Sequence, residues 1–204
     1  AGRPPTCRPV WLLGWSRCEL SDSNKVYLHL LCTLTPSLSI LNMSSSNDTV
    51  PSVGDRAPDF TLYSSEQNPW RLSDQDQPVV LLFFPGAFTS VCTSEMNTVN
   101  KDLDAYAQAH VVGISTDSPF VLAEFQSVEQ LDFPLLSDHD AEVSARYGSK
   151  YENDFTSMGL DRVAKRSAFV VDQEGLVRYA EVLDNAGKQP DFEAIKDTVQ
   201  SLSA

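Results

Sequence analysis

Between positions 79 and 128, short apolar runs alternate with stretches in which apolar residues recur at helical spacing. Residues 79–84 and 110–115 are short, largely apolar runs of strand length, as expected of strands buried on both faces of a sheet. Each run is followed by apolar residues at three- and four-residue spacing, which predicts a helix with one buried face. Ser118 and Pro119 are a suitable N-cap and first residue for the second helix. The two predicted stripes are Met96, Val99, Leu103 and Tyr106, and then Val121, Phe125 and Val128.

Strand patterns before and after this stretch predict two hairpins. Residues 59–63 alternate between polar and apolar, and a turn at Asn68 and Pro69 leads into residues 70–72. Residues 168–172 and 176–180 flank a Gln-Glu-Gly turn, which predicts an antiparallel hairpin.

Two further helices complete the pattern. Residues 138–147 predict a short helix closed by Gly148, and a last helix carries a stripe of Phe192, Ile195, Val199 and Leu202. Taken in order, these elements predict an α/β fold in which helices flank a central mixed sheet and a β-hairpin comes first.

Residues 1–42 differ in composition from the rest of the chain. They hold three of the four cysteines, namely Cys7, Cys18 and Cys32. A secretory signal needs an unbroken apolar stretch, but His29 and Pro36 interrupt the apolar residues of this segment. A functional arm is the other alternative, although no amphipathic period runs across residues 1–42. We expect a non-native or disordered leader over 1–42 with Met43 as the true first residue, a polar lead-in over 43–52, and one domain over 53–204.

Net charge narrows the range of partners. Fifteen Lys and Arg residues against 28 Asp and Glu residues give a net charge of −13, which excludes nucleic acid and disfavours anionic membranes. Such acidity fits a very salty cytoplasm, where ions screen the self-repulsion, although an acidic mesophilic protein is the alternative. With one cysteine outside the leader and no secretion signal, we expect a reducing, cytoplasmic location.

That cysteine, Cys92, follows the end of the first buried strand. Pro85 and Gly86 end the strand, and Thr89 or Ser90 is a good N-cap, so Cys92 falls in the first turn of a helix. Free N–H groups and the helix dipole there stabilise a thiolate, the nucleophilic form of cysteine. The competing interpretation is that Cys92 is a small buried hydrophobe.

The spacing Pro85-x-x-x-Thr89-x-x-Cys92 resembles the active-site signature of the peroxiredoxins, the alkyl hydroperoxide reductase and thiol-specific antioxidant family. Residues 53–62 resemble the start of that family, and residues 166–172 resemble its active-site arginine and the strand behind it. The resemblance covers about residues 51–204 and implies a thioredoxin-like fold and an antioxidant peroxidase activity.

The resemblance implies a role for each motif residue. Cys92 attacks the peroxide, Pro85 shields it, the Thr89 hydroxyl holds the attacked oxygen, and Arg166 keeps Cys92 anionic and steers the substrate. The alternatives for Arg166 are a surface charge or replacement by Arg146 as the active-site cation. Glu95 either orients Arg166 or only interacts with the helix dipole.

The sequence departs from much of the family in its resolving thiol. No cysteine follows Cys92, and the position that some members use, five residues on, is Asn97. The Cys92 sulfenic acid is then expected to be recycled by an external low-molecular-weight thiol or a thioredoxin-like protein. A leader cysteine could serve only if the leader is native. By analogy with the family, we expect a homodimer or larger homo-oligomer.

Other functions are weaker. A thioredoxin-type exchanger needs a second thiol near Cys92, and none is present. A peroxide sensor or chaperone-like protein with low turnover stays open. We expect no metal and no cofactor, because His29, His110 and His139 form no ligand spacing with Cys92 and no glycine-rich phosphate loop occurs.

Overall fold

The computed structural model describes residues 50–152, 155 and 159–202. The expected leader, 1–42, and most of the lead-in lie outside the described residues. Seven strands form one sheet in the order β2-β1-β5-β4-β3-β6-β7. The strands are β1 (Thr61–Ser64), β2 (Pro69–Arg71), β3 (Val79–Phe83), β4 (His110–Ser115), β5 (Leu135–Ser137), β6 (Ser167–Val171) and β7 (Val177–Val182).

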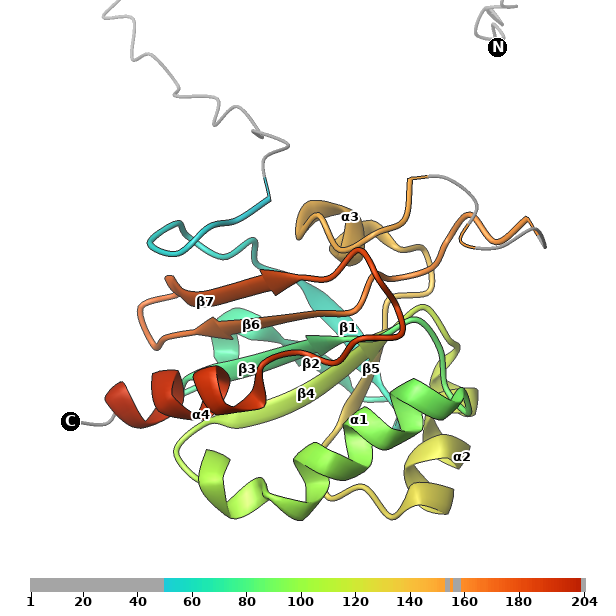
Figure 1. Ribbon diagram of the computed structural model, residues 1–204, viewed down its shortest axis with the longest axis horizontal. Helices are drawn as coiled ribbons and strands as arrows, with labels where there is room; N and C mark the ends of the chain where they lie inside the picture. Colours follow the sequence, from blue (N-terminus) through green and yellow to red (C-terminus); the bar gives the residue numbers. More distant parts are fainter. Residues whose placement is uncertain (1–49, 153–154, 156–158, 203–204) are drawn as a thin grey trace, which may run out of the picture. The chain divides into compact units, whose positions relative to one another are not determined.

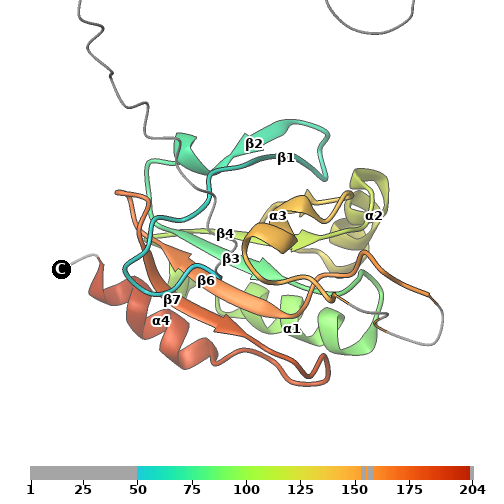
Figure 2. The same cartoon turned by 90° about the horizontal axis from the view of Figure 1, so that it is seen from above.

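The sheet is mixed, as the sequence predicts. Strands β3, β4 and β5 run parallel, while β6 pairs antiparallel with β3 and β1 pairs antiparallel with β5. The predicted hairpins are β1–β2 and β6–β7, which lie at opposite edges of the sheet (Figure 2).

Helices cover both faces of the sheet (Figure 1). They are α1 (Ser90–Lys101), α2 (Pro119–Glu129), α3 (Glu142–Arg146) and α4 (Phe192–Ser201), with short 3-10 turns η1 (Leu72–Asp74) and η2 (Leu103–Tyr106). Helices α1, α2 and α4 lie on one side of the sheet and α3 on the other. Among the described residues, no helix combines the length and apolarity needed to cross a membrane.

Strand β3 shows why the sheet needs cover on both faces. All five of its residues are buried, and they alternate between two apolar clusters. Val80 and Leu82 join the cluster that holds Cys92, Met96 and Val99 of α1. Val79, Leu81 and Phe83 join the opposite cluster with Tyr147 and Phe169. A continuously apolar run is therefore stable here only because both faces are covered.

Three local predictions need correction, and one strand was missed. The helix predicted over residues 138–147 is confined to α3, Glu142–Arg146. Helix α1 ends at Lys101, so Leu103 and Tyr106 belong to η2 instead of continuing the helix. The buried residues of α2 are Leu122 and Phe125, whereas Val121 and Val128 are exposed. Strand β5 was not predicted, because three residues behind a proline carry too short a pattern.

Candidate active site

Cys92 lies just beyond the carboxyl end of β3. Phe84 and Pro85 leave the strand, a loop runs to Thr89, and Cys92 is the third residue of α1. Its side chain faces the sheet, on the helix face that it shares with Glu95, Met96 and Val99, and the residue is only 1% exposed. The amino end of a helix leaves backbone N–H groups without intrahelical partners, and Cys92 lies in this first turn.

Strand pairing brings Arg166 to Cys92 from a distant part of the chain. In the antiparallel pair β3–β6, Phe83 is opposite Ser167, so Arg166 lies beside the point where the chain leaves β3. Arg166 is 1% exposed, and its Nη2 donates a hydrogen bond to Cys92 Sγ over 3.3 Å. The interpretation of Arg166 as a surface charge is therefore wrong.

Two acceptors fix the guanidinium in this position. Its Nη1 donates to Glu95 Oε2 in a fully buried ion pair. Its Nε and Nη2 both donate to the backbone carbonyl of Ala186, at 3.3 and 3.0 Å. Arg166 thus joins the first two turns of α1 to the loop that follows β7, and one cation lies between Cys92 and the Glu95 carboxylate.

Glu95 is completely buried and contacts Arg166 directly. Within the described residues, its second oxygen, Oε1, has no hydrogen-bond partner. A buried carboxylate is stable only beside a compensating charge, so Glu95 depends on Arg166 as much as it orients it. An interaction with the helix dipole alone does not describe this contact.

The loop between β3 and α1 has an unusual conformation. Phe88 has a φ of 61°, in the left-handed region that a bulky residue rarely adopts, and its ring packs edge-on against Phe125 at 5.1 Å. Thr89 occupies the N-cap position, but its side chain makes no capping bond. Instead its hydroxyl donates to the carbonyl of Gly86 over 3.0 Å.

One side chain that holds this loop was not predicted. Asp117, two residues after β4, accepts a hydrogen bond from the backbone N–H of Ala87 over 2.7 Å. Its position could have been a signal, because side chains just past the carboxyl ends of parallel strands meet at one edge of a sheet. Nothing in the sequence could reveal the Ala186 carbonyl, since a backbone group carries no residue signature.

The structure brings Cys92, Arg166 and Glu95 into direct contact, and it places Pro85 and Thr89 on the loop before Cys92. It does not bring Arg146 there, because Arg146 Nη1 donates to the carbonyl of Asp59. His110 pairs with Asp76, and His139 contacts the carbonyl of Thr116. Among the described residues, no group of three or more His, Cys, Asp and Glu side chains is arranged to hold a metal ion.

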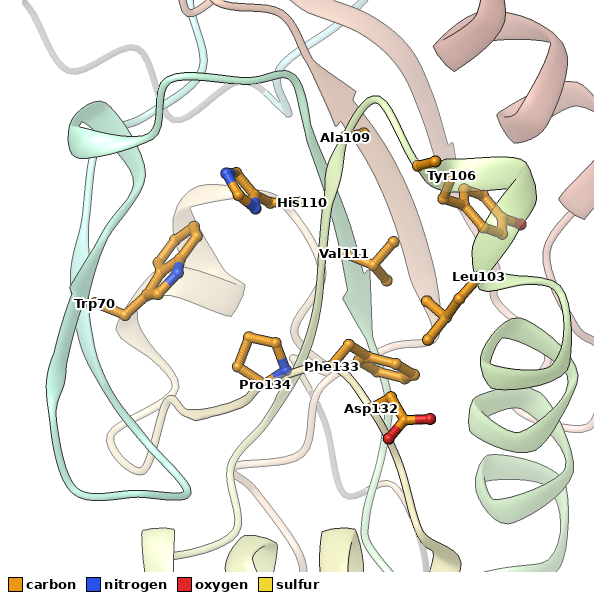
Figure 3. Close-up of a pocket in the computed structure, with 10 residues that line it drawn as sticks. Trp70, Leu103, Tyr106, Ala109, His110, Val111, Asp132, Phe133 and Pro134 are labelled. Carbon is orange, nitrogen blue, oxygen red and sulfur yellow. The ribbon is translucent and has the colours of Figure 1, made fainter.

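A pocket of about 230 Å³ lies away from Cys92 (Figure 3). Trp70 of β2, His110 at the start of β4, and Pro134 surround it. Strands β3 and β4 are parallel, so the start of β4 and the carboxyl end of β3 lie at opposite ends of the sheet. This pocket is therefore separate from the Cys92 site.

The chain is similar in sequence to known proteins. A sequence model of the AhpC/TSA family matches residues 53–180. Peroxiredoxin Bcp of Escherichia coli is 35% identical over 129 residues, which cover 62% of this chain and 82% of that protein. A thiol peroxidase of Oceanobacillus iheyensis is 30% identical over 163 residues, covering 76% and 95% of the two chains.

The fold also matches a solved structure. The crystal structure of peroxidoxin BcpB from Mycobacterium tuberculosis superposes with a TM-score of 0.67 at 32% identity, over 76% of this chain and 99% of that one. This match confirms the predicted thioredoxin-like fold.

Proposed function

The chain belongs to the AhpC/TSA family of peroxiredoxins, a family of oxidoreductases, and on this basis we propose that it is a single-cysteine thiol peroxidase with Cys92 as its nucleophile. The observation that carries this proposal is the buried contact between Arg166 Nη2 and Cys92 Sγ at the start of α1. A guanidinium and a helix terminus together stabilise a thiolate. A merely structural buried cysteine needs neither.

The proposed first step is attack by the Cys92 thiolate on the terminal oxygen of a hydroperoxide. The S–O bond forms as the O–O bond breaks, and the leaving oxygen takes a proton to become an alcohol or water. Negative charge moves onto that oxygen, so hydrogen-bond donors placed in advance lower the barrier. We assign this task to Arg166. The Thr89 hydroxyl would exchange its bond to Gly86 for one to the attacked oxygen, which it holds in line with the sulfur.

Pro85 and Glu95 act on the same step without donating to the substrate. Pro85 is half-buried at the start of the loop, where its ring limits the access of water to sulfur. Glu95 holds one side of the Arg166 guanidinium and leaves Nη2 directed at Cys92. Holding sulfur, peroxide and donors in line adds the gain that comes from positioning.

The resulting Cys92 sulfenic acid is recycled by an external thiol. A first thiol condenses with it to give a mixed disulfide and water, and a second thiol releases the Cys92 thiolate. Asn97, the position that some family members use for a resolving cysteine, instead donates from Nδ2 to Glu129 Oε2 over 2.7 Å and so joins α1 to α2.

A peroxide sensor or chaperone-like protein is the alternative that uses the same cysteine. It would form the same sulfenic acid but turn over slowly. The arrangement of donors around Cys92 favours the enzyme, because it would stabilise the transition state of every attack.

We also propose the cellular setting that the sequence favours. A net charge of −13 supports a cytoplasm rich in salt, with activity and stability that rise as salt screens the repulsion.

Exposed apolar side chains, Phe88 on the active-site loop and Phe120 on α2, support a homodimer or larger homo-oligomer.

The test is peroxide consumption by the full chain under excess dithiothreitol, at low and high salt. We expect turnover that is lost in Cys92→Ser and retained when Cys7, Cys18 and Cys32 are replaced together by serine. A folded wild-type chain without turnover at either salt concentration would refute the proposed peroxidase activity. Loss of turnover in the triple variant would show instead that a leader cysteine resolves Cys92.

A further inference from the structure

Asp117 joins the carboxyl end of β4 to the loop that precedes Cys92. Its Oδ2 accepts the Ala87 N–H over 2.7 Å, across 30 positions of sequence. We propose that Asp117 is a positioning residue for the peroxidase reaction, which holds the loop so that the Thr89 hydroxyl meets the attacked oxygen. This inference rests on the proposed function.

Asp117 is itself held, at its carboxylate and at its backbone carbonyl, by serines at the ends of two strands. Ser115, the last residue of β4, is fully buried and donates from Oγ to Asp117 Oδ2 over 2.8 Å. Ser137, the last residue of β5, donates from Oγ to the Asp117 carbonyl over 2.6 Å. Asp117 is thus fixed to the rigid centre of the sheet, and the bond to Ala87 transmits that rigidity to a loop.

The loop needs such an anchor because its conformation is unfavourable. Phe88, the residue after Ala87, has a φ of 61°. A bulky residue keeps a left-handed conformation only where the surroundings impose it. Here two contacts impose it: the Asp117 carboxylate on the Ala87 amide, and the Phe125 ring against the Phe88 ring.

The turn at Phe88 decides where Thr89 lies. Thr89 is the N-cap of α1, and its hydroxyl bonds to Gly86, on the other side of the same turn. If Asp117 releases Ala87, the turn relaxes and the hydroxyl moves relative to Cys92. Cys92 itself stays in place, because Arg166 and the apolar face of α1 hold it independently.

Because Asp117 acts on Thr89 and not on Cys92, its removal should have an effect that general damage to the fold would not produce. Removing it is expected to slow attack on peroxide, which needs the Thr89 hydroxyl. Alkylation of Cys92 by iodoacetamide needs the thiolate but no oxygen donor, so its rate is expected to stay nearly unchanged. Substitutions of Asp117 and Thr89 should not be additive, because they remove the same contact with substrate.

The experiment compares the rate constants for oxidation and alkylation of Cys92 in the full chain. We expect Asp117→Ala to slow oxidation by H₂O₂ about 10²-fold, the effect of a displacement of about 1 Å at a reacting group. Asp117→Asn should recover most of the rate, because its side-chain carbonyl still accepts the Ala87 N–H. In a Thr89→Val background, Asp117→Ala should cost less than about threefold, well short of its effect alone.

Asp59→Ala is the matched control, because its carboxylate likewise accepts a backbone N–H, that of Ser73 in η1 over 3.0 Å, and not that of Ala87. It should leave oxidation within about twofold of wild type, the effect of a substitution away from the reacting groups. If Asp117→Ala does not fold, Asp117→Ser replaces it, since a serine hydroxyl is too short to reach Ala87.

Three results would overturn the inference: unchanged oxidation in Asp117→Ala, an equal loss of oxidation and alkylation, or full additivity with Thr89→Val. A wild-type chain whose Cys92 resists peroxide would overturn the proposed function instead.

Discussion

Arg166 Nη2 lies 3.3 Å from Cys92 Sγ, although 74 positions of sequence separate the two residues. Antiparallel pairing of β3 with β6 produces this contact, because it sets the residue before β6 beside the chain as it leaves β3. The same guanidinium holds the Glu95 carboxylate. Reactivity and stability therefore depend on one cation, and substitutions are expected to affect the two properties in different proportions.

Arg166→Gln is expected to lower both the free energy of unfolding and the rate of Cys92 oxidation. It leaves the Glu95 carboxylate buried without a counter-charge, which costs about 3–5 kcal/mol of unfolding free energy. It also removes a donor from the reacting sulfur, which should slow Cys92 oxidation by at least about 10²-fold. Urea unfolding and stopped-flow oxidation measure the two effects.

The double variant Arg166→Gln/Glu95→Gln separates the effect on stability from the effect on oxidation. It buries two neutral amides, so most of the lost unfolding free energy should return while the oxidation rate stays low. Arg146→Gln, which removes an exposed arginine bonded to Asp59, is the matched control and should retain the wild-type rate. Recovery of the rate in the double variant would argue against a direct role for Arg166.

Thr89→Val tests the hydroxyl at nearly constant side-chain volume. We expect oxidation to slow about 10²-fold, the effect of losing a group that positions the reacting oxygen. Thr89→Ser keeps the hydroxyl and should stay within about tenfold of wild type. Equal rates for the valine and serine variants would show that the hydroxyl takes no part.

Gly113→Ala tests how tightly side chains of β5 and α1 pack against β4. An added Cβ would lie 2.6 Å from Leu135 Cδ2 and 3.3 Å from Met96 Sδ, so the core must shift to admit it. Overpacking of this kind costs about 1–3 kcal/mol, measured as a lower urea midpoint. Glu124→Ala, on the exposed side of α2, is the control and should change little. A Gly113→Ala variant as stable as wild type would mean that the Leu135 and Met96 side chains move aside freely.

Asp172, in the turn between β6 and β7, should make stability fall in acid. Burial alone would raise the pKa of its carboxyl, but hydrogen bonds from the Leu176 amide and from Arg178 outweigh burial and lower that pKa below its ordinary value of 3.8. The stabilisation is therefore complete above about pH 5 and is lost as the pH falls through the folded-state pKa.

Asp172→Asn, which carries no charge at any pH, isolates this contribution. It should be about 1 kcal/mol less stable than wild type at pH 7, and the difference should shrink toward zero in acid. Urea unfolding at a series of pH values measures it. A difference that stays constant down to pH 2 would show that the charge of Asp172 has no part in stability.

Local pattern predicted most of the fold. The run that became β3 is apolar throughout, and Gly175, with a φ of 78°, marks the turn between β6 and β7. Helix α2 shows the limit, because apolar residues lie on several of its sides and the sequence favours no single face. Packing against the sheet selected Leu122 and Phe125, while Phe120 and Val121 stayed exposed.

The residues of the candidate site also fall into two groups, those that the sequence indicates and those that it does not. Cys92, Thr89 and Pro85 lie in one short motif, and Arg166 in another, so the sequence could indicate them. Asp117 and the Ala186 carbonyl reach the site only through the order of strands and the path of the chain after β7. Such contacts depend on topology, which periodicity does not specify.

The role of Cys92 is tested most directly by mass spectrometry of the cysteines in the full chain, after treatment with one equivalent of H₂O₂ and the sulfenic-acid trap dimedone. We expect a dimedone adduct on Cys92 in nearly every chain, no adduct in Cys92→Ser, and release of the unmodified thiol when dithiothreitol is added before dimedone. An unoxidised Cys92, or a disulfide between Cys92 and Cys7, Cys18 or Cys32, would contradict a peroxidase that depends on one cysteine and an external thiol.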